Sequence, residues 1–174
     1  MASWDCPKPT LAAVYGYCIG GAFELSLACD VTVAARGTRF GAPEVKFGSE
    51  AVALLLPWIA GPKAAKALLM SGDDTLDAER ALALGIVNHV VPDGDEYGKA
   101  LAEGMAAAAP NAVRLTKLAI NRSLDAMGLR SALTQAPELD IHIEASGGPE
   151  RAEFDRIRRE QGLQAALSWR DARA

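Results

Sequence analysis

Apolar residues concentrate in three short segments near the start of the chain, separated by glycines and polar residues. Residues 10–15 predict a strand, and residues 31–35 predict a second, buried strand. Between them, residues 22–28 are apolar on nearly all sides apart from Glu24, which is typical of a buried helix. A strand, a helix and a strand in this order favour parallel pairing, so we expect an α/β fold.

The remainder of the chain is mostly helical in pattern, with proline and glycine at the breaks. Beyond about residue 96 the helical patterns continue to the end, and Pro137 is expected to kink or end one of these helices. We divide the chain into a partial core over residues 1–109 and a helical region over residues 110–174. Upstream of that boundary, two helices and a strand are predicted over residues 63–70, 77–84 and 86–91.

Two adjacent glycines, Gly20 and Gly21, join the first strand to the predicted buried helix. Glycine lets a backbone amide approach a ligand closely, and the first turn of a helix has free N–H groups and a partial positive charge. Glu24 lies three residues after Gly21, hence one turn further along the same helical face. The turn therefore combines an amide that could hold an oxyanion with a carboxylate that could move a proton.

A second carboxylate, Glu44, has a similar setting in the segment Phe-Gly-Ala-Pro-Glu-Val. Partial burial raises a carboxyl pKa toward the range in which proton transfer is efficient, and a well-placed group contributes about 10²–10⁴-fold to a rate. A structural explanation also exists, in which Glu24 pairs with Arg39 or Lys46 and Glu44 caps the next helix. The shared glycine context of the two acids favours acid–base chemistry over that alternative.

Composition excludes several classes of protein. With 174 residues, of which 50% are hydrophobic, the chain can form a sizeable core, and disorder is not expected. A net charge of −4 argues against a general nucleic-acid or membrane-surface role. Three cysteines without a C-x-x-C motif favour a reduced, cytoplasmic setting. The apolar span over residues 11–35 contains Glu24 near its middle, so we interpret it as buried core and not as a membrane helix.

Six short motifs lie along the chain, over residues 8–14 (KPTLAAV), 16–25 (GYCIGGAFEL), 28–30 (ACD), 40–45 (FGAPEV), 85–88 (GIVN) and 115–117 (LTK). Together they resemble the crotonase family, the enoyl-CoA hydratases and isomerases, and the resemblance covers essentially the whole chain from Lys8. It implies a crotonase-like ββα spiral core followed by a helical oligomerisation tail. It also implies an acyl-CoA substrate, no cofactor beyond the coenzyme A of that substrate, and a trimer or a dimer of trimers.

The resemblance also implies roles for matching residues. In crotonases the second glycine of the pair gives an oxyanion-hole amide to the thioester carbonyl, and here that glycine is Gly21. Two glutamates position and deprotonate water and protonate the α-carbon; they match Glu24 and Glu44, and the presence of both favours a hydratase. Residues beside these three are the expected substrate contacts: Gly20, Ala22 and Pro43.

Two features depart from the family pattern. The N-terminal region, which in relatives supplies the second oxyanion amide and much of the CoA adenine site, has no counterpart here. A gene fragment or a wrong start is the leading explanation, and such a chain would expose the edge where earlier strands pair. The stretch after Glu44 is shorter and more apolar than in hydratases, which predicts a different acyl pocket. Its candidate lining residues, for which core packing is the alternative, are Phe47, Leu55 and Trp58.

The remaining signals are weaker. Glu50 is either a third acid or a solvated helix end, and His89 and His142 lie far apart without an evident third ligand, so no metal site is predicted. Four arginines near the end of the chain could contact CoA phosphates across a subunit boundary. The acids that alternate with them favour an exposed, salt-bridged helix. This arginine group consists of Arg151, Arg156, Arg158 and Arg159.

The predicted function is that of an enoyl-CoA hydratase, which adds water to an acyl-CoA thioester or removes it. An enoyl-CoA isomerase or another crotonase reaction is the first alternative. A noncatalytic fragment that acts only in association with other copies is the second.

Overall fold

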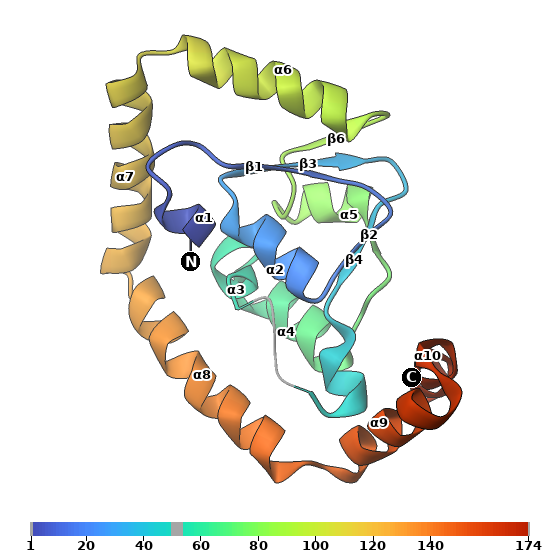
Figure 1. The fold of residues 1–174 in the computed structure, drawn as a ribbon. Helices are drawn as coiled ribbons and strands as arrows, with labels where there is room; N and C mark the ends of the chain where they lie inside the picture. The colour runs from blue at the N-terminus through green and yellow to red at the C-terminus, as the bar shows by residue number, and fades with distance from the viewer. Residues whose placement is uncertain (1, 50–53, 174) are drawn as a thin grey trace.

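A computed structural model describes residues 2–49 and 54–173 (Figure 1). Its first sheet has the strand order β1-β3-β6 and is parallel throughout. Leu11 lies opposite Val31, and Val33 lies opposite His89. The predicted α/β class with parallel pairing is therefore confirmed. The strands are β1 (Leu11–Val14), β3 (Val31–Ala35) and β6 (His89–Val91).

The second sheet is also small and has the strand order β2-β4-β5. β2 (Tyr17–Ile19) pairs with β4 (Arg39–Gly41) in parallel, and β4 pairs with β5 (Leu76–Asp77) antiparallel. The chain passes twice through the same order of elements: β1 and β2 precede the helix α2 (Gly21–Ala28), and β3 and β4 precede the 3-10 helix η1 (Pro43–Phe47). The second pass stacks on the first, because β3 pairs with β1 and β4 pairs with β2. This stacking brings the start of α2 close to η1, which is the arrangement that positions the candidate site.

Short helices enclose the core on the sides of these sheets. The largest fully buried side chains include Phe23 of α2 and Phe40 of β4, whose rings meet edge to face with centroids 5.9 Å apart. Such aromatic pairs add about 0.5–1.5 kcal/mol beyond their buried area. The enclosing helices are α1 (Ala2–Asp5), α3 (Leu56–Ile59), α4 (Gly61–Ser71), α5 (Ala78–Ala83) and α6 (Gly94–Ala107).

The last part of the chain forms an arm that leaves the core and returns to it. In Figure 1, α7 and α8 run along the outside, and α9 and α10 lie beside η1. Of the two outcomes expected at Pro137, a kink or a helix end, the second is wrong, because α8 continues through it. Pro137 is exposed, so water can hydrogen-bond the carbonyl that loses its donor. The bounds are α7 (Pro110–Ala126), α8 (Leu129–Ser146), α9 (Pro149–Gln161) and α10 (Leu163–Asp171).

The helix α2 is only partly buried, in contrast to the all-round burial that its sequence predicts. Phe23 and Leu27 face the core, whereas Leu25 is 58% exposed and Ala22 is also exposed. Both exposed side chains border a cavity of about 620 Å³ that lies against β1 and β2. Those two strands are the outer strands of their sheets among the described residues.

No helix within residues 2–49 and 54–173 is long and apolar enough to cross a bilayer. Glu50, which the sequence offers as a third acid, lies outside the described residues.

Candidate active site

The glycine pair forms the sharp turn that starts α2. Gly20 has φ 60° and ψ −124°, a conformation that glycine alone adopts readily. Its N–H donates to the Gly41 carbonyl at 2.9 Å, and its carbonyl accepts from the Glu24 N–H at 3.0 Å. The next residue, Gly21, is the first of the helix, so its amide is one of those that an α-helix leaves without an intrahelical acceptor. A Cβ at Gly21 would meet nothing within 4 Å, so the space beside this amide is open.

The carboxylate of Glu44 lies directly against this turn. A Cβ built on Gly20 would be 2.3 Å from Glu44 Oε1, so the carboxylate occupies the space that any larger residue at position 20 would need. The other oxygen, Oε2, is buried and has no hydrogen-bond partner among the described residues. The two motifs that the sequence singled out separately are therefore neighbours in space, with Glu44 Oε1 against Gly20.

The surroundings of Glu44 favour its neutral form. Burial raises the pKa of this carboxyl group above its ordinary value, and the negative charges of Asp74 and Glu24 raise it further. A backbone hydrogen bond at Glu44 itself and the positive charge of Arg170 act in the opposite direction but do not cancel the rise in pKa. The raised pKa makes Glu44 a candidate for proton transfer.

The structural pairing proposed for Glu24 is not observed. Lys46 Nζ pairs with Asp74 Oδ1 at 3.5 Å, and Arg39 Nη1 donates to the Thr75 carbonyl at 2.8 Å. Neither cation forms an ion pair with Glu24 among the described residues, and a role of Glu24 in acid–base chemistry stays a prediction.

Gly20→Ala is expected to disrupt the site as well as the backbone. The substitution puts a side chain at positive φ, which costs about 1–3 kcal/mol, and its Cβ would have to displace the Glu44 carboxylate. Gly37→Ala is the matched control, because Gly37 has φ 80° and open space around its Cβ. Chemical denaturation should show a loss of stability in both variants, larger in Gly20→Ala because of the added clash, while a titration should show a changed Glu44 pKa only in Gly20→Ala. An unchanged Glu44 pKa in Gly20→Ala would contradict the contact.

The candidate pocket residues lie in two different parts of the structure. Leu55 is 2% exposed and belongs to the main core, and Trp58 is partly buried against the same core. Phe47 stacks on Phe154 of α9, with ring centroids 4.5 Å apart. Their alternative interpretation as packing residues thus accounts for all three positions, and a role in substrate binding stays a prediction.

The arginine group on α9 is largely engaged in ion pairs. Arg151 pairs with Asp155 at 3.2 Å, and Arg156 pairs with Glu153 and Glu160 at 2.6 Å each. These contacts confirm the salt-bridged helix that the interleaved charges predict.

Within residues 2–49 and 54–173, no group of three or more His, Cys, Asp or Glu side chains could hold a metal ion.

One part of the site was not predicted from the sequence. Arg170 on α10 is 9% exposed and donates to Asp74 Oδ2 at 2.9 Å, beside the turn that carries Glu44. The two residues are 96 positions apart, and no local motif indicates such a pairing.

The fold is that of the crotonases. A crystal structure of an enoyl-CoA hydratase/isomerase from Xanthobacter autotrophicus Py2 superposes on 99% of the chain with a TM-score of 0.95 and 47% identity, and the match covers 65% of that protein. A crystal structure of an enoyl-CoA hydratase from Mycobacterium smegmatis superposes on 98% of the chain with a TM-score of 0.89 and 29% identity, covering 58% of that protein.

The family follows from the sequence comparison as well. The model of the enoyl-CoA hydratase/isomerase family matches residues 1–146, so the chain belongs to this family. A Thermus thermophilus protein provisionally named an enoyl-CoA hydratase is 41% identical over 145 residues, which are 81% of this chain and 56% of that protein. The short-chain-enoyl-CoA hydratase of Clostridium acetobutylicum is 36% identical over 67% of this chain and 46% of its own length. The chain thus spans about half the length of these curated relatives.

Proposed function

We propose that the chain provides the catalytic acids and one oxyanion donor of an enoyl-CoA hydratase. The observation that carries the proposal is the contact between the Glu44 carboxylate and the Gly20-Gly21 turn. The contact puts one carboxylate beside the start of α2, where the Gly21 amide has no intrahelical acceptor, and Glu24 lies one turn further along the same helix. The names of the relatives, which include hydratases that act on acyl-CoA substrates, support this choice within the family.

The proposed reaction uses each group once. The Gly21 amide donates a hydrogen bond to the thioester carbonyl, which stabilises the negative charge that develops there when the double bond is attacked. Glu24 accepts a proton from water while the water oxygen bonds to the β-carbon. Glu44, whose pKa is raised by burial, delivers its proton to the α-carbon. One molecule of water is thereby added across the double bond, and the reverse sequence removes it.

The test is hydration of a 2-enoyl-CoA, followed by the loss of absorbance of the conjugated thioester. The chain should be assayed alone and together with whatever coding sequence precedes Met1, since a lost oxyanion donor typically costs about 10²–10³-fold in rate. Glu24→Gln should reduce turnover by about 10²–10⁴-fold. Turnover that Glu24→Gln leaves intact would contradict the proposal, and formation of conjugated thioester from a 3-enoyl-CoA, without hydration, would favour the isomerase.

An assembly of three or six copies is part of the same proposal. The described residues of α7 include no buried side chain, and apolar side chains are exposed along α7 and α8. Such a surface favours contact with another subunit. The exposed side chains include Ile120, Met127, Leu139 and Ile141.

A further inference from the structure

Residues 72–74 form a loop that contacts the chain both before and after Glu44. On one side, a Cβ on Gly41 would come within 2.2 Å of the Asp73 carbonyl oxygen, so the backbones of β4 and the loop are in direct contact. On the other side, a Cβ on Gly72 would come within 2.8 Å of Lys46 Cγ. The Ala42 N–H also donates to the Asp73 carbonyl at 3.3 Å. Any shift of this loop must therefore move the residues on either side of Glu44.

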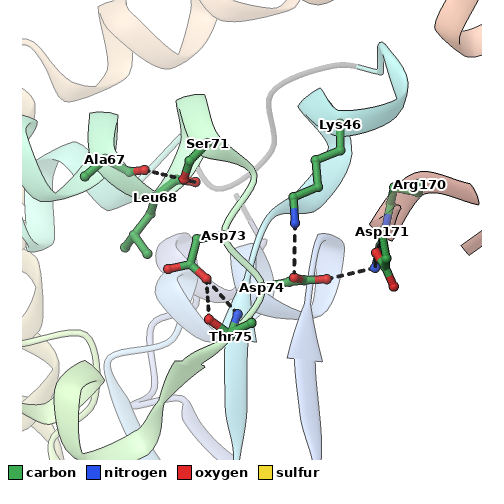
Figure 2. A network of polar contacts seen from close by, with 9 residues as sticks. All are labelled: Lys46, Ala67, Leu68, Ser71, Asp73, Asp74, Thr75, Arg170 and Asp171. Atoms are coloured by element: carbon green, nitrogen blue, oxygen red, sulfur yellow. Dashed lines mark hydrogen bonds and ion pairs between the residues drawn. The ribbon is translucent and has the colours of Figure 1, made fainter. Parts of the chain in front are cut away.

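The loop is itself fixed by polar contacts (Figure 2). The Asp73 carboxylate accepts from the N–H and the hydroxyl of Thr75, at 2.8 and 2.7 Å. Asp74 lies between two cations, with Lys46 of η1 at 3.5 Å from one carboxylate oxygen and Arg170 of α10 at 2.9 Å from the other. The side chain of Arg170 is 11% exposed, so this ion pair is largely shielded from water.

The C-terminal helices also contact η1 directly. Phe154 of α9 stacks on Phe47, and the Arg151 guanidinium lies 5.9 Å from the centre of the Phe47 ring. Backbone and Cβ atoms of Glu150 and Arg151 would be 3.4–3.6 Å from a Cβ on Gly48. The end of the chain therefore packs on η1, and the ion pair between Arg170 and Asp74 joins α10 to the loop beside η1.

We propose that Arg170 is a positioning residue for Glu44, acting through Asp74 to hold the η1 turn and to balance the negative charge around it. The proposal rests on the proposed function for its effect on turnover, but its structural part does not. Charged groups approach η1 from every neighbouring element that packs on it: Glu24 from α2, Asp74 from the loop after α4, Glu150 and Arg151 from α9 and Arg170 from α10, with Lys46 on η1 itself. Among the ion pairs of the described residues, Arg170 and Lys46 are the cations on Asp74.

The test compares Arg170→Gln, Arg170→Lys and Asp74→Asn in the full chain. Amide hydrogen exchange over residues 43–47 should become at least about tenfold faster in Arg170→Gln, because the buried Asp74 loses a partner. The Glu44 pKa, followed by NMR of ¹³C-labelled glutamate and assigned with Glu44→Gln, should rise in Arg170→Gln and fall in Asp74→Asn. Arg170→Lys keeps the positive charge and should restore most of the wild-type behaviour. In an active preparation, Arg170→Gln should lower kcat more than it raises KM.

Arg156→Gln is the control, because Arg156 is 45% exposed and its ion pairs within the described part of the chain are with acids of its own helix. The proposal is overturned if Arg170→Gln changes exchange over residues 43–47 no more than this control does. It is also overturned if Arg170→Gln and Asp74→Asn move the Glu44 pKa in the same direction. Should Arg170→Gln fail to fold, Asp74→Asn takes its place: it should speed exchange over residues 43–47 beyond the Arg156→Gln control, whereas Arg170→Lys should not. Equal exchange in these three variants would overturn the proposal. Exchange and pKa need no turnover, so a failure of the hydratase assignment would leave both readouts intact.

Discussion

Glu44→Gln is expected to lower kcat for hydration by about 10²–10⁴-fold and to leave the fold at least as stable as the wild type near pH 8. Glutamine keeps the shape of the side chain but cannot deliver a proton to the α-carbon. The substitution also removes a group whose ionised form is disfavoured by burial and by the charges of Asp74 and Glu24. Enzyme kinetics and urea denaturation on the same preparations would measure the two effects.

The sign of the stability effect follows from the direction of the pKa shift. Because the pKa of Glu44 is raised in the folded state, the folded protein binds this proton more tightly than the unfolded chain does. The wild type therefore loses stability as the pH rises from the ordinary pKa of a glutamate, about 4.3, through the raised folded value. Glu44→Gln lacks this loss. The free energies of unfolding of the two proteins should therefore agree at low pH, and that of the wild type should fall below that of Glu44→Gln as the pH rises.

The pH dependence of turnover gives a second readout of the same group. If Glu44 acts as the proton donor, kcat falls as the pH rises through its pKa in the substrate complex. Glu103→Gln is the control, since Glu103 is exposed on α6. A Glu44→Gln variant that keeps wild-type turnover would remove Glu44 from the chemistry. A stability loss at pH 8 larger than that of Glu103→Gln would show that the carboxylate is a structural acid.

The sequence predicts those parts of the fold that local chemistry determines. β1 lies inside the predicted segment 10–15, and α5 begins after Asp77, whose side chain accepts from the Arg80 N–H at 2.7 Å as an N-cap. The predicted strand over residues 86–91 is shorter in the structure. Only His89–Val91 forms β6, because the N–H groups of Ile86 and Val87 donate to the Ala81 carbonyl of α5, at 2.9 and 3.4 Å, and not to a neighbouring strand.

Contacts between distant segments could not be predicted in the same way. The sequence marks Gly20 and Glu44 as two separate candidates, but only the stacking of successive chain turns places the carboxylate on the glycine. The pairing of Arg170 with Asp74 depends on where a long helical arm returns, and the arm carries no local signal for its end point. The exposure of Leu25 likewise depends on what packs beside β1 and β2, and not on the pattern of α2 itself.

Lys117→Met is expected to destabilise the chain by about 1–3 kcal/mol, the range for leaving hydrogen-bonding groups without a partner. The side chain of Lys117 is 9% exposed, and its ammonium group is 2.7 Å from Asp30 Oδ2. It also donates to the carbonyls of Ser3 and Lys8 at 3.1 Å each, so all three of its protons have acceptors. Methionine would fill similar space but leave Asp30 and two carbonyls without this donor. Urea denaturation would measure the loss.

The reason for this large effect is the place of Lys117 in the fold. It joins α7, the first helix of the arm, to the segment before β1 and to the residue that precedes β3. Asp30 also accepts from the N–H and the hydroxyl of Thr10, at 2.7 and 3.0 Å, so one carboxylate oxygen gathers three donors. Adding Asp30→Asn to Lys117→Met should recover part of the loss, because it removes the uncompensated charge. Lys99→Met is the control on exposed α6 and should change stability by less than about 0.5 kcal/mol. Equal losses in Lys117→Met and Lys99→Met would mean that the arm is held to the core by its apolar contacts and not by this ion pair.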